Sequence, residues 1–200
     1  PAGAPAPRRF VDATHGLGLG GLVGGRAKLV DVDADGRPDV VVPGRAGTVP
    51  AVLLNEHPDP FRRVAEPGLP VLERGDLIVL ADLDADGHVD ALVTRFVEAP
   101  DGPDARPERT AVHRGRGDGT FGPAIPIAAA TPATTCAVAV GDANGDGHLD
   151  LLLGQWYRAY GRSLAGFEDE LLLRDASRPD ELAFVRATLE HDADADDGGG

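Results

Sequence analysis

The chain has 200 residues and a formal net charge of −14, with 42% hydrophobic residues, 27 glycines and 17 prolines. This length allows one domain with a substantial core. The negative charge disfavours nucleic acid and anionic membrane surfaces as partners, because both repel an acidic protein. The high glycine and proline content, with only 4% aromatic residues, favours short strands and turns over long helices.

The first nine residues, PAGAPAPRR, are typical of a Pro/Ala-rich linker, left after processing or by a cut in a longer chain. We expect residues 10–200 to form the folded part. Cys136 is the single cysteine, so an intrachain disulfide is excluded. No apolar run reaches the ~18 residues that a membrane helix needs, so we expect no transmembrane segment.

A nine-residue acidic pattern, D-x-[D/N]-x-D-G-x-x-D, occurs three times along the chain. The copies are DVDADGRPD at 31–39, DLDADGHVD at 82–90 and DANGDGHLD at 142–150. Phe10, Phe61 and Phe121 each lie 21 residues before the first aspartate of a copy. This constant spacing indicates a repeated unit that consists of a phenylalanine, a connection, a strand and an acidic loop.

Short apolar runs on both sides of each loop predict two strands per unit, and two further runs follow. In chain order the runs are AKLVDVD, DVVVP, AVLLN and FRRVA; DLIVLADLD, DALVTRFV, TAVHR and FGPAI; and CAVAVGD, DLLLGQWY, ELLLRD and AFVRATL. Four short antiparallel strands per unit are typical of a β-propeller blade.

We therefore predict an all-β fold of four-stranded antiparallel blades at about residues 26–66, 75–128 and 134–190, within a larger propeller of about six to eight blades. Phe184 opens FVRAT, which resembles FVDAT at 10–14. Residues 191–200 are then expected to connect to a further blade, with a degenerate fourth metal loop as the alternative.

The spacing of the pattern explains why so many aspartates are close together. Positions one, three, five and nine can direct side chains at one centre, and position seven can add its backbone carbonyl. Ca²⁺ prefers six to eight such oxygens, and Mg²⁺ is the second choice because it keeps its waters. We expect about three ions, one in each loop. The expected ligands are Asp31, Asp33, Asp35, Arg37 and Asp39; Asp82, Asp84, Asp86, His88 and Asp90; and Asp142, Asn144, Asp146, His148 and Asp150. Of these, Arg37, His88 and His148 would bind only through their backbone carbonyls.

Electrostatics supports such ions. Two carboxylates about 4 Å apart repel by about 4 kcal/mol at an effective dielectric constant near 20. At roughly 1–2 mM calcium, a site with a Kd of about 10⁻⁴ M adds about 1.5 kcal/mol to the free energy of unfolding. Cytosolic calcium would leave such sites nearly empty, so we expect an extracytoplasmic location.

Other interpretations of the loops and of further motifs are weaker. An EF-hand needs an acidic residue at position twelve, where this chain has Val42, Val93 and Leu153. Zinc binding by His88 and His148 is disfavoured, because a side chain at position seven is expected to point outward. Solvated acidic turns are disfavoured by the three regularly spaced copies. Two Arg-Gly-Asp tripeptides, at 74–76 and 116–118, spell an integrin-recognition sequence, and we expect them to be coincidental. Three aromatic residues, Trp156, Tyr157 and Tyr160, are expected to be core residues, with a sugar-stacking platform as the alternative.

The stretches GRGDGTFGPAIPI and VAVGDANGDGHLDLLLG resemble the FG-GAP/VCBS repeat, the blade unit of integrin-α-like β-propellers. RFVDATHGLGL is similar to the opening of bacterial propellers related to cartilage acidic protein. The resemblance implies Ca²⁺ in the hairpin between the first and second strands of a blade. It also implies an exported protein with a binding or adhesion role.

The strand order predicts where a ligand binds. In an antiparallel blade the acidic loops share one face with the turns between the third and fourth strands. The opposite face carries longer connections at 15–25, 98–108 and 158–167, where we expect a protein or glycan ligand. We assign no catalytic residue and disfavour an enzyme. The alternatives are a propeller domain of a calcium-dependent polysaccharide lyase or of a secreted hydrolase, and a structural spacer.

Overall fold

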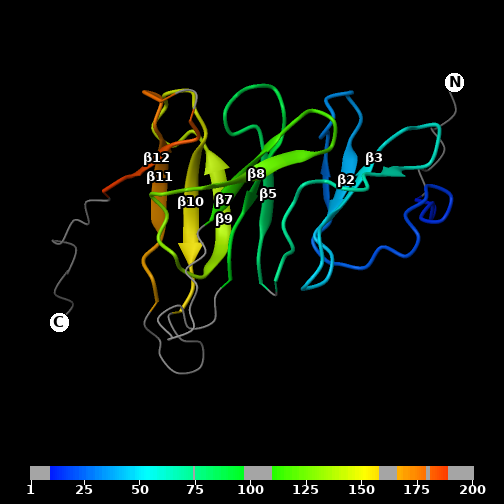
Figure 1. The fold of residues 1–200 in the computed structure, drawn as a ribbon, viewed down its shortest axis with the longest axis horizontal. Helices are drawn as coiled ribbons and strands as arrows, with labels where there is room; N and C mark the ends of the chain where they lie inside the picture. Colours follow the sequence, from blue (N-terminus) through cyan, green and yellow to red (C-terminus); the bar gives the residue numbers. More distant parts are fainter. Residues whose placement is uncertain (1–9, 74, 97–109, 158–165, 179–180, 189–200) are drawn as a thin grey trace, which may run out of the picture.

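The computed structural model describes residues 10–73, 75–96, 110–157, 166–178 and 181–188. Within these residues, three four-stranded antiparallel sheets follow one another along the molecule (Figure 1). The strands are β1 (Lys28–Val30), β2 (Asp39–Val42), β3 (Ala51–Leu54) and β4 (Arg62–Arg63); β5 (Ile78–Ala81), β6 (Asp90–Val93), β7 (Ala111–Gly115) and β8 (Phe121–Pro126); and β9 (Thr135–Gly141), β10 (Asp150–Gln155), β11 (Glu170–Arg174) and β12 (Phe184–Arg186).

Each sheet pairs its strands in chain order, so each is built like a propeller blade. The predicted all-β class and the predicted strands are confirmed, and each acidic loop connects the first two strands of its blade. Other predictions concern residues outside the described ranges: the linker at 1–9, Arg74, the connection at 98–108, residues 158–165 with Tyr160, and 191–200. In the described part, no helix has the length and apolarity needed to cross a membrane.

The hydrophobic core lies between the blades, because β-strands direct alternate side chains to opposite faces of a sheet. In β6, Ala91 and Val93 pack towards the first blade, where they join a cluster that includes Val41 and Val52. Leu92 points the other way, into a cluster with Leu151 of the third blade. The second blade is therefore buried on both faces, and the packing holds the three hairpin loops along one edge.

The outer face of the first blade is covered by a preceding segment of the chain. Leu19 and Leu22, together with Phe61, pack against Val40 and Leu53 on that face. Residues 15–25 are the segment expected among the connections of the ligand face, and within it Leu19 and Leu22 serve to cover the first sheet. Both leucines are half-buried there, and removing apolar side chains from water stabilises this position.

The regular phenylalanines mark the fourth strand of each blade. Phe121 and Phe184 are the first residues of β8 and β12, and Phe61 directly precedes β4. Phe121 is 2% exposed and packs in the cluster between the first and second blades. Phe10 is fully exposed and belongs to none of the described strands. The constant spacing thus measures the distance from a fourth strand to the next acidic loop.

Candidate metal sites

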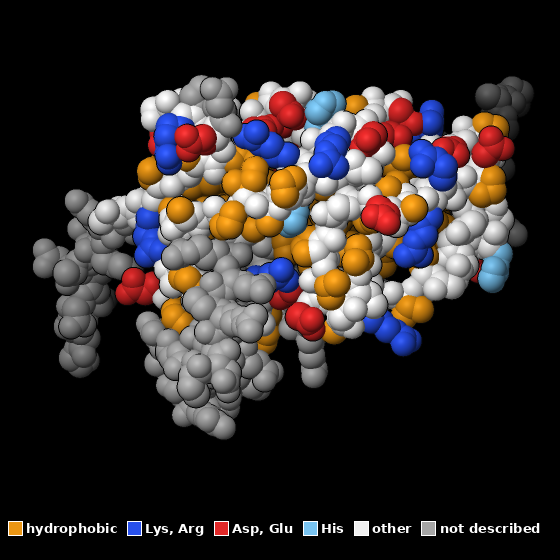
Figure 2. Space-filling model, in the orientation of Figure 1, with side chains coloured by type: hydrophobic (Ala, Val, Ile, Leu, Met, Phe, Trp, Pro, Cys, Tyr) orange, Lys and Arg blue, Asp and Glu red, His pale blue; other side chains and the backbone are white. Residues whose placement is uncertain are grey.

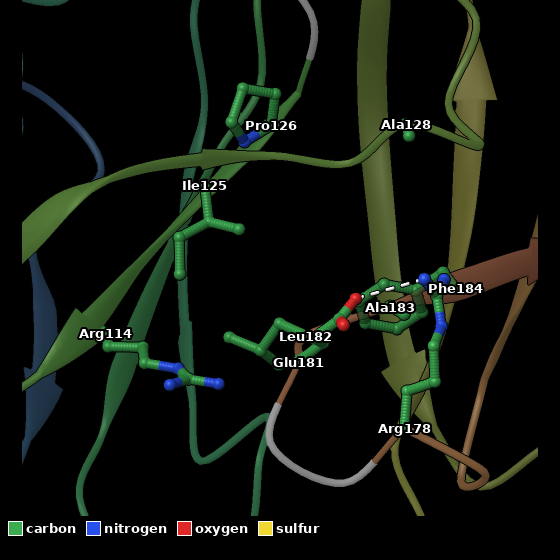
Figure 3. A pocket seen from close by; sticks show the side chains of 9 residues that line it. All are labelled: Arg114, Ile125, Pro126, Ala128, Arg178, Glu181, Leu182, Ala183 and Phe184. Atoms are coloured by element: carbon green, nitrogen blue, oxygen red, sulfur yellow. Dashed lines mark hydrogen bonds and ion pairs between the residues drawn. The ribbon is translucent and has the colours of Figure 1, made fainter.

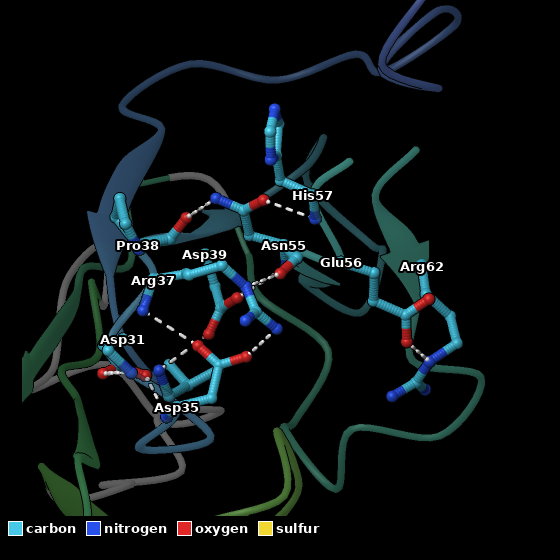
Figure 4. A network of polar contacts seen from close by, with 11 residues as sticks. Asp31, Asp35, Arg37, Pro38, Asp39, Asn55, Glu56, His57 and Arg62 are labelled. Carbon is cyan, nitrogen blue, oxygen red and sulfur yellow. Dashed lines mark hydrogen bonds and ion pairs between the residues drawn. The ribbon is translucent and has the colours of Figure 1, made fainter. Parts of the chain in front are cut away.

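The first aspartate of each loop organises the turn, because its carboxylate accepts hydrogen bonds from backbone N–H groups of the loop (Figure 4). In the first loop, Asp31 accepts hydrogen bonds from the N–H groups of Asp35 at 3.1 Å and Gly36 at 2.8 Å. Asp35 in turn accepts one from the N–H of Arg37 at 2.8 Å. The same three bonds recur at equivalent positions of the second and third loops. The repeated pattern therefore encodes one loop conformation three times.

Two positions of this loop have left-handed backbone. The glycines at position six have φ of 86°, 89° and 86°, as the sequence predicted. Position four is also left-handed, with φ of 58° at Ala34, 60° at Ala85 and 79° at Gly145. Sequence reasoning missed this second requirement, although the glycine at position four of the third loop was a visible signal. An alanine in this region is strained, because its Cβ approaches the following carbonyl oxygen.

The last aspartate of each loop is buried and connects three strands. Asp39, Asp90 and Asp150 are at most 1% exposed. One carboxylate oxygen accepts a hydrogen bond from the N–H at position two, and the other accepts one from an N–H at the end of the third strand. The donors are Val32 and Asn55 at 2.8 and 2.7 Å, Leu83 and Gly115 at 2.9 and 2.8 Å, and Ala143 and Arg174 at 2.9 and 2.8 Å.

Burial raises the pKa of two of these aspartates, Asp39 and Asp90. Desolvation raises the pKa of Asp90 to about 6, even though the N–H groups of Gly115 and Leu83 oppose the shift. The pKa of Asp39 is also raised, again mainly by burial. A raised pKa means that the surroundings disfavour the charged carboxylate. A cation bound nearby would favour the charged form.

In the first two loops, three aspartates converge closely enough to share an ion. Oxygens of Asp31, Asp33 and Asp39 lie within 4.8 Å of one another. The second group consists of Asp82, Asp84 and Asp86.

The side chain of Asp33 indicates that the first group suits a metal ion, because its Oδ1 is buried and has no hydrogen-bond partner. Burial, then the charges of Asp39, Asp35 and Asp31, raise the pKa of Asp33. The donor set consists of hard oxygens and fits Ca²⁺. The ion would supply positive charge that neutralises the repulsion.

Other predicted ligands are arranged differently. Asp35 is exposed and forms an ion pair with the side chain of Arg37, which also donates to the carbonyl oxygen of Asn55 at 2.6 Å. His88 does not point outward as expected, because its ring packs on Gly117, where a Cβ would be only 2.5 Å away. His148 is exposed.

The third loop replaces one carboxylate by an amide. Asn144 stands at position three, and its Nδ2 donates to Asp146 at 2.9 Å. Asp142 and Asp150 keep the hydrogen bonds of their counterparts, so the loop has the same frame with fewer charges. Among the described residues, three acidic side chains converge only in the first two loops.

Residues outside the loops also take part. Arg114 of β7 forms an ion pair with Asp84 at 3.0 Å, a contact that sequence reasoning missed. The side chain of Asp76, in the first Arg-Gly-Asp tripeptide, is 1% exposed and forms an ion pair with Arg95 at 2.8 Å, so it has a structural role. Trp156 and Tyr157 are half-buried and form an edge-to-face pair with ring centroids 5.2 Å apart.

Comparison with known proteins identifies the family of this chain. The sequence profile of the FG-GAP-like repeat matches residues 31–93 and 102–153, which together make up more than half of the chain. The chain belongs to the FG-GAP-like repeat family. The matched residues include all three acidic loops, so the loops described above lie within the family's repeats.

One similar solved structure is a lectin of Agrocybe aegerita, described for its specific recognition of non-reducing terminal N-acetylglucosamine. The sequence identity is 18% and the TM-score is 0.53, so the likeness concerns the fold alone. The match covers 82% of this chain and 37% of the lectin chain. The chain therefore spans well under half the length of this relative. No curated protein matches the sequence.

The left-handed position four predicts opposite effects of two reciprocal substitutions. Ala34→Gly relieves backbone strain and should raise the free energy of unfolding by about 0.5 kcal/mol, after the entropy of glycine is subtracted. Gly145→Ala should lower it by a similar amount, and no atom lies within 4 Å of the added Cβ. Urea unfolding in chelator measures both. A destabilising Ala34→Gly would contradict the left-handed assignment.

The buried last aspartate predicts a large structural effect that does not depend on metal. Asp150→Ala leaves the N–H groups of Ala143 and Arg174 without their acceptor, which should cost about 2–4 kcal/mol in chelator. Asp146→Ala is the matched control in the same loop, because Asp146 is exposed. We expect it to change stability by less than about 1 kcal/mol. Equal losses would show that Asp150 has no special role.

Proposed function

We propose that this chain is a calcium-binding β-propeller scaffold of an exported protein, and that it binds a carbohydrate. The observation that carries the calcium proposal is the first loop. Three aspartates converge there, and the Oδ1 atom of Asp33 is buried without a partner. Asp31, Asp33 and Asp39 would hold the ion in this loop. Asp82, Asp84, Asp86 and Asp90 would hold an ion in the second loop, and Asp142, Asn144, Asp146 and Asp150 in the third.

The ions have a structural role in this proposal. Each loop joins the first two strands of a blade, and its last aspartate reaches the third strand. A cation that draws these carboxylates together therefore stabilises the blade as a whole. Sites with a Kd of about 10⁻⁴ M are filled at millimolar calcium and not at cytosolic levels, which supports export.

The ligand proposal rests on the end of the blades opposite the loops. Asp150 ends the third acidic loop and begins β10, so Trp156, which follows the last residue of that strand, lies at the other end. Its half-buried ring and that of Tyr157 form an aromatic pair there. Aromatic faces are well suited to stack on sugar rings, because they are apolar and still carry polar atoms. The lectin with the same fold supports a carbohydrate over a protein ligand.

The calcium proposal predicts that Asp33→Asn changes stability in opposite directions with and without metal. In chelator the variant should unfold at a higher temperature than the parent, because a repelled carboxylate becomes neutral. In about 2 mM Ca²⁺ it should lose one site's contribution, about 1.8 kcal/mol for a Kd of about 10⁻⁴ M. Calorimetric melting in both buffers makes the measurement.

The matched control is Asp59→Asn, which removes a negative charge from an exposed residue between β3 and β4. It should affect the two melting temperatures equally. If calcium raises the melting temperature of neither the parent nor the control, the three loops are acidic turns and the calcium proposal is wrong.

The ligand proposal predicts that the ring of Trp156 is needed for glycan binding. On a glycan array, the parent should bind, Trp156→Ala should lose at least about tenfold in affinity, and Trp156→Phe should retain part of it. His148→Ala, an exposed change on the loop face of the same blade, is the control and should bind normally. Unchanged binding by Trp156→Ala would exclude this aromatic pair as the site.

A further inference from the structure

Arg114 brings a positive charge to the second acidic loop from another strand. Its Nε lies 3.0 Å from Oδ2 of Asp84, whose side chain is only 8% exposed, whereas that of Arg114 is 37% exposed. Water screens such a pair less than one on the open surface. Burial and the charge of Asp86 raise the pKa of Asp84, and Arg114 opposes both effects. The guanidinium thus supplies part of the charge that a cation would supply.

This contact is special to the second blade. The N–H groups of Asn55, Gly115 and Arg174 make equivalent hydrogen bonds to the last aspartates of the three loops, so these residues occupy equivalent positions. The residues immediately before them are Leu54, Arg114 and Leu173. Leucine at this position cannot pair with an acidic loop, so the arginine is a local addition to the repeat.

The formal charges of the three loops suggest why the second blade has an arginine at position 114. The first loop has four carboxylates, and Arg37 pairs with one of them. The second has four carboxylates and Arg114. The third has three carboxylates, because Asn144 replaces one. Each loop with its partner therefore has a formal charge of −3, reached in a different way.

We propose that Arg114 is a built-in counter-cation of the second loop, which stabilises the loop without metal and competes with a bound metal ion for Asp84. This inference rests on the proposed calcium function and adds a determinant of affinity that lies outside the repeated motif. It implies that the second loop binds Ca²⁺ less tightly than the same loop with leucine at position 114.

The surroundings allow the arginine to leave Asp84 when an ion binds. Arg114 lines a cavity of about 320 Å³ between the second and third blades, opposite Leu182 and Glu181 (Figure 3). Glu181, which forms an ion pair with Arg178 at 3.0 Å, provides a second carboxylate on the wall of this cavity. The side chain can thus move within an existing space, so competition does not require the blades to separate.

The test follows each loop separately during a Ca²⁺ titration of the full chain. Gly36, Gly87 and Gly147 donate their N–H groups to the first aspartates of the three loops, so their amide NMR signals report binding loop by loop. In Arg114→Leu the Gly87 midpoint should fall about tenfold, the effect expected for removing one positive charge about 6 Å from a divalent ion in a water-like dielectric. The Gly36 and Gly147 midpoints should not change.

Three controls separate this effect from others. Arg116→Gln removes the same charge from the adjacent turn, where Arg116 contacts Thr120 at 3.4 Å, and should leave the Gly87 midpoint unchanged. Arg114→Lys keeps the charge and should stay close to the parent. Arg114→Gln removes the charge and keeps N–H donors, so it provides the test if the leucine variant does not fold. In chelator, Arg114→Leu and Arg114→Gln should both melt at a lower temperature than the parent.

The outcomes are distinct. A selective tightening at Gly87 supports the inference, and so does a Gly87 signal that responds to Ca²⁺ only in the neutral variants. An unchanged or weakened Gly87 midpoint, with Gly36 and Gly147 titrating normally, overturns the inference and leaves the calcium function intact. If none of the three glycines responds in any variant, the calcium function and the inference both fail. Figure 3 shows Arg114 and its neighbours on the cavity wall.

Discussion

The buried last aspartate of each loop is the interaction on which the rest of a blade depends. Its two oxygens accept backbone hydrogen bonds from the loop and from the third strand, as with Val32 and Asn55 around Asp39. A carboxylate oxygen has two lone pairs, so it can accept a hydrogen bond and still bind a metal ion. The same residue can therefore order the blade and serve the ion. This dual role explains why Asp39 is found in the converging group of the first loop.

Packing between the blades then sets the position of the loops. Ala91 and Val93 contact the first blade and Leu92 the third, so the second sheet is fixed on both faces. Since each blade begins with the same hairpin, stacking the sheets places the acidic loops along one edge, where Asp and Glu side chains gather (Figure 2). The edge is not uniformly negative, because Arg37 and Arg114 are positioned among the aspartates. The protein thus offsets part of its own repulsion.

Most of the fold could be predicted because it is encoded locally and repeated. The aspartate spacing identified the loops, the apolar runs identified the strands, and Gly36 and its counterparts indicated left-handed backbone. What could not be predicted depends on contacts between distant residues. Arg114 is 30 positions after Asp84, and only the register of β7 brings them together. The packing of Leu19 and Leu22 on the first sheet could not be predicted for the same reason, because the sequence does not indicate which sheet face buries them.

The strands separate the proposed metal sites from the proposed ligand site. β10 has six residues and therefore spans about 20 Å between the third loop and Trp156. An ion in that loop cannot touch a sugar stacked on the ring of Trp156. Calcium can then affect a ligand only through the order of the blade, by way of Asp150 and its hydrogen bond to Arg174 of β11. Ligand affinity should accordingly depend on calcium only under conditions where the loss of the ions loosens the blade, and a blade that stays folded in chelator should keep its ligand.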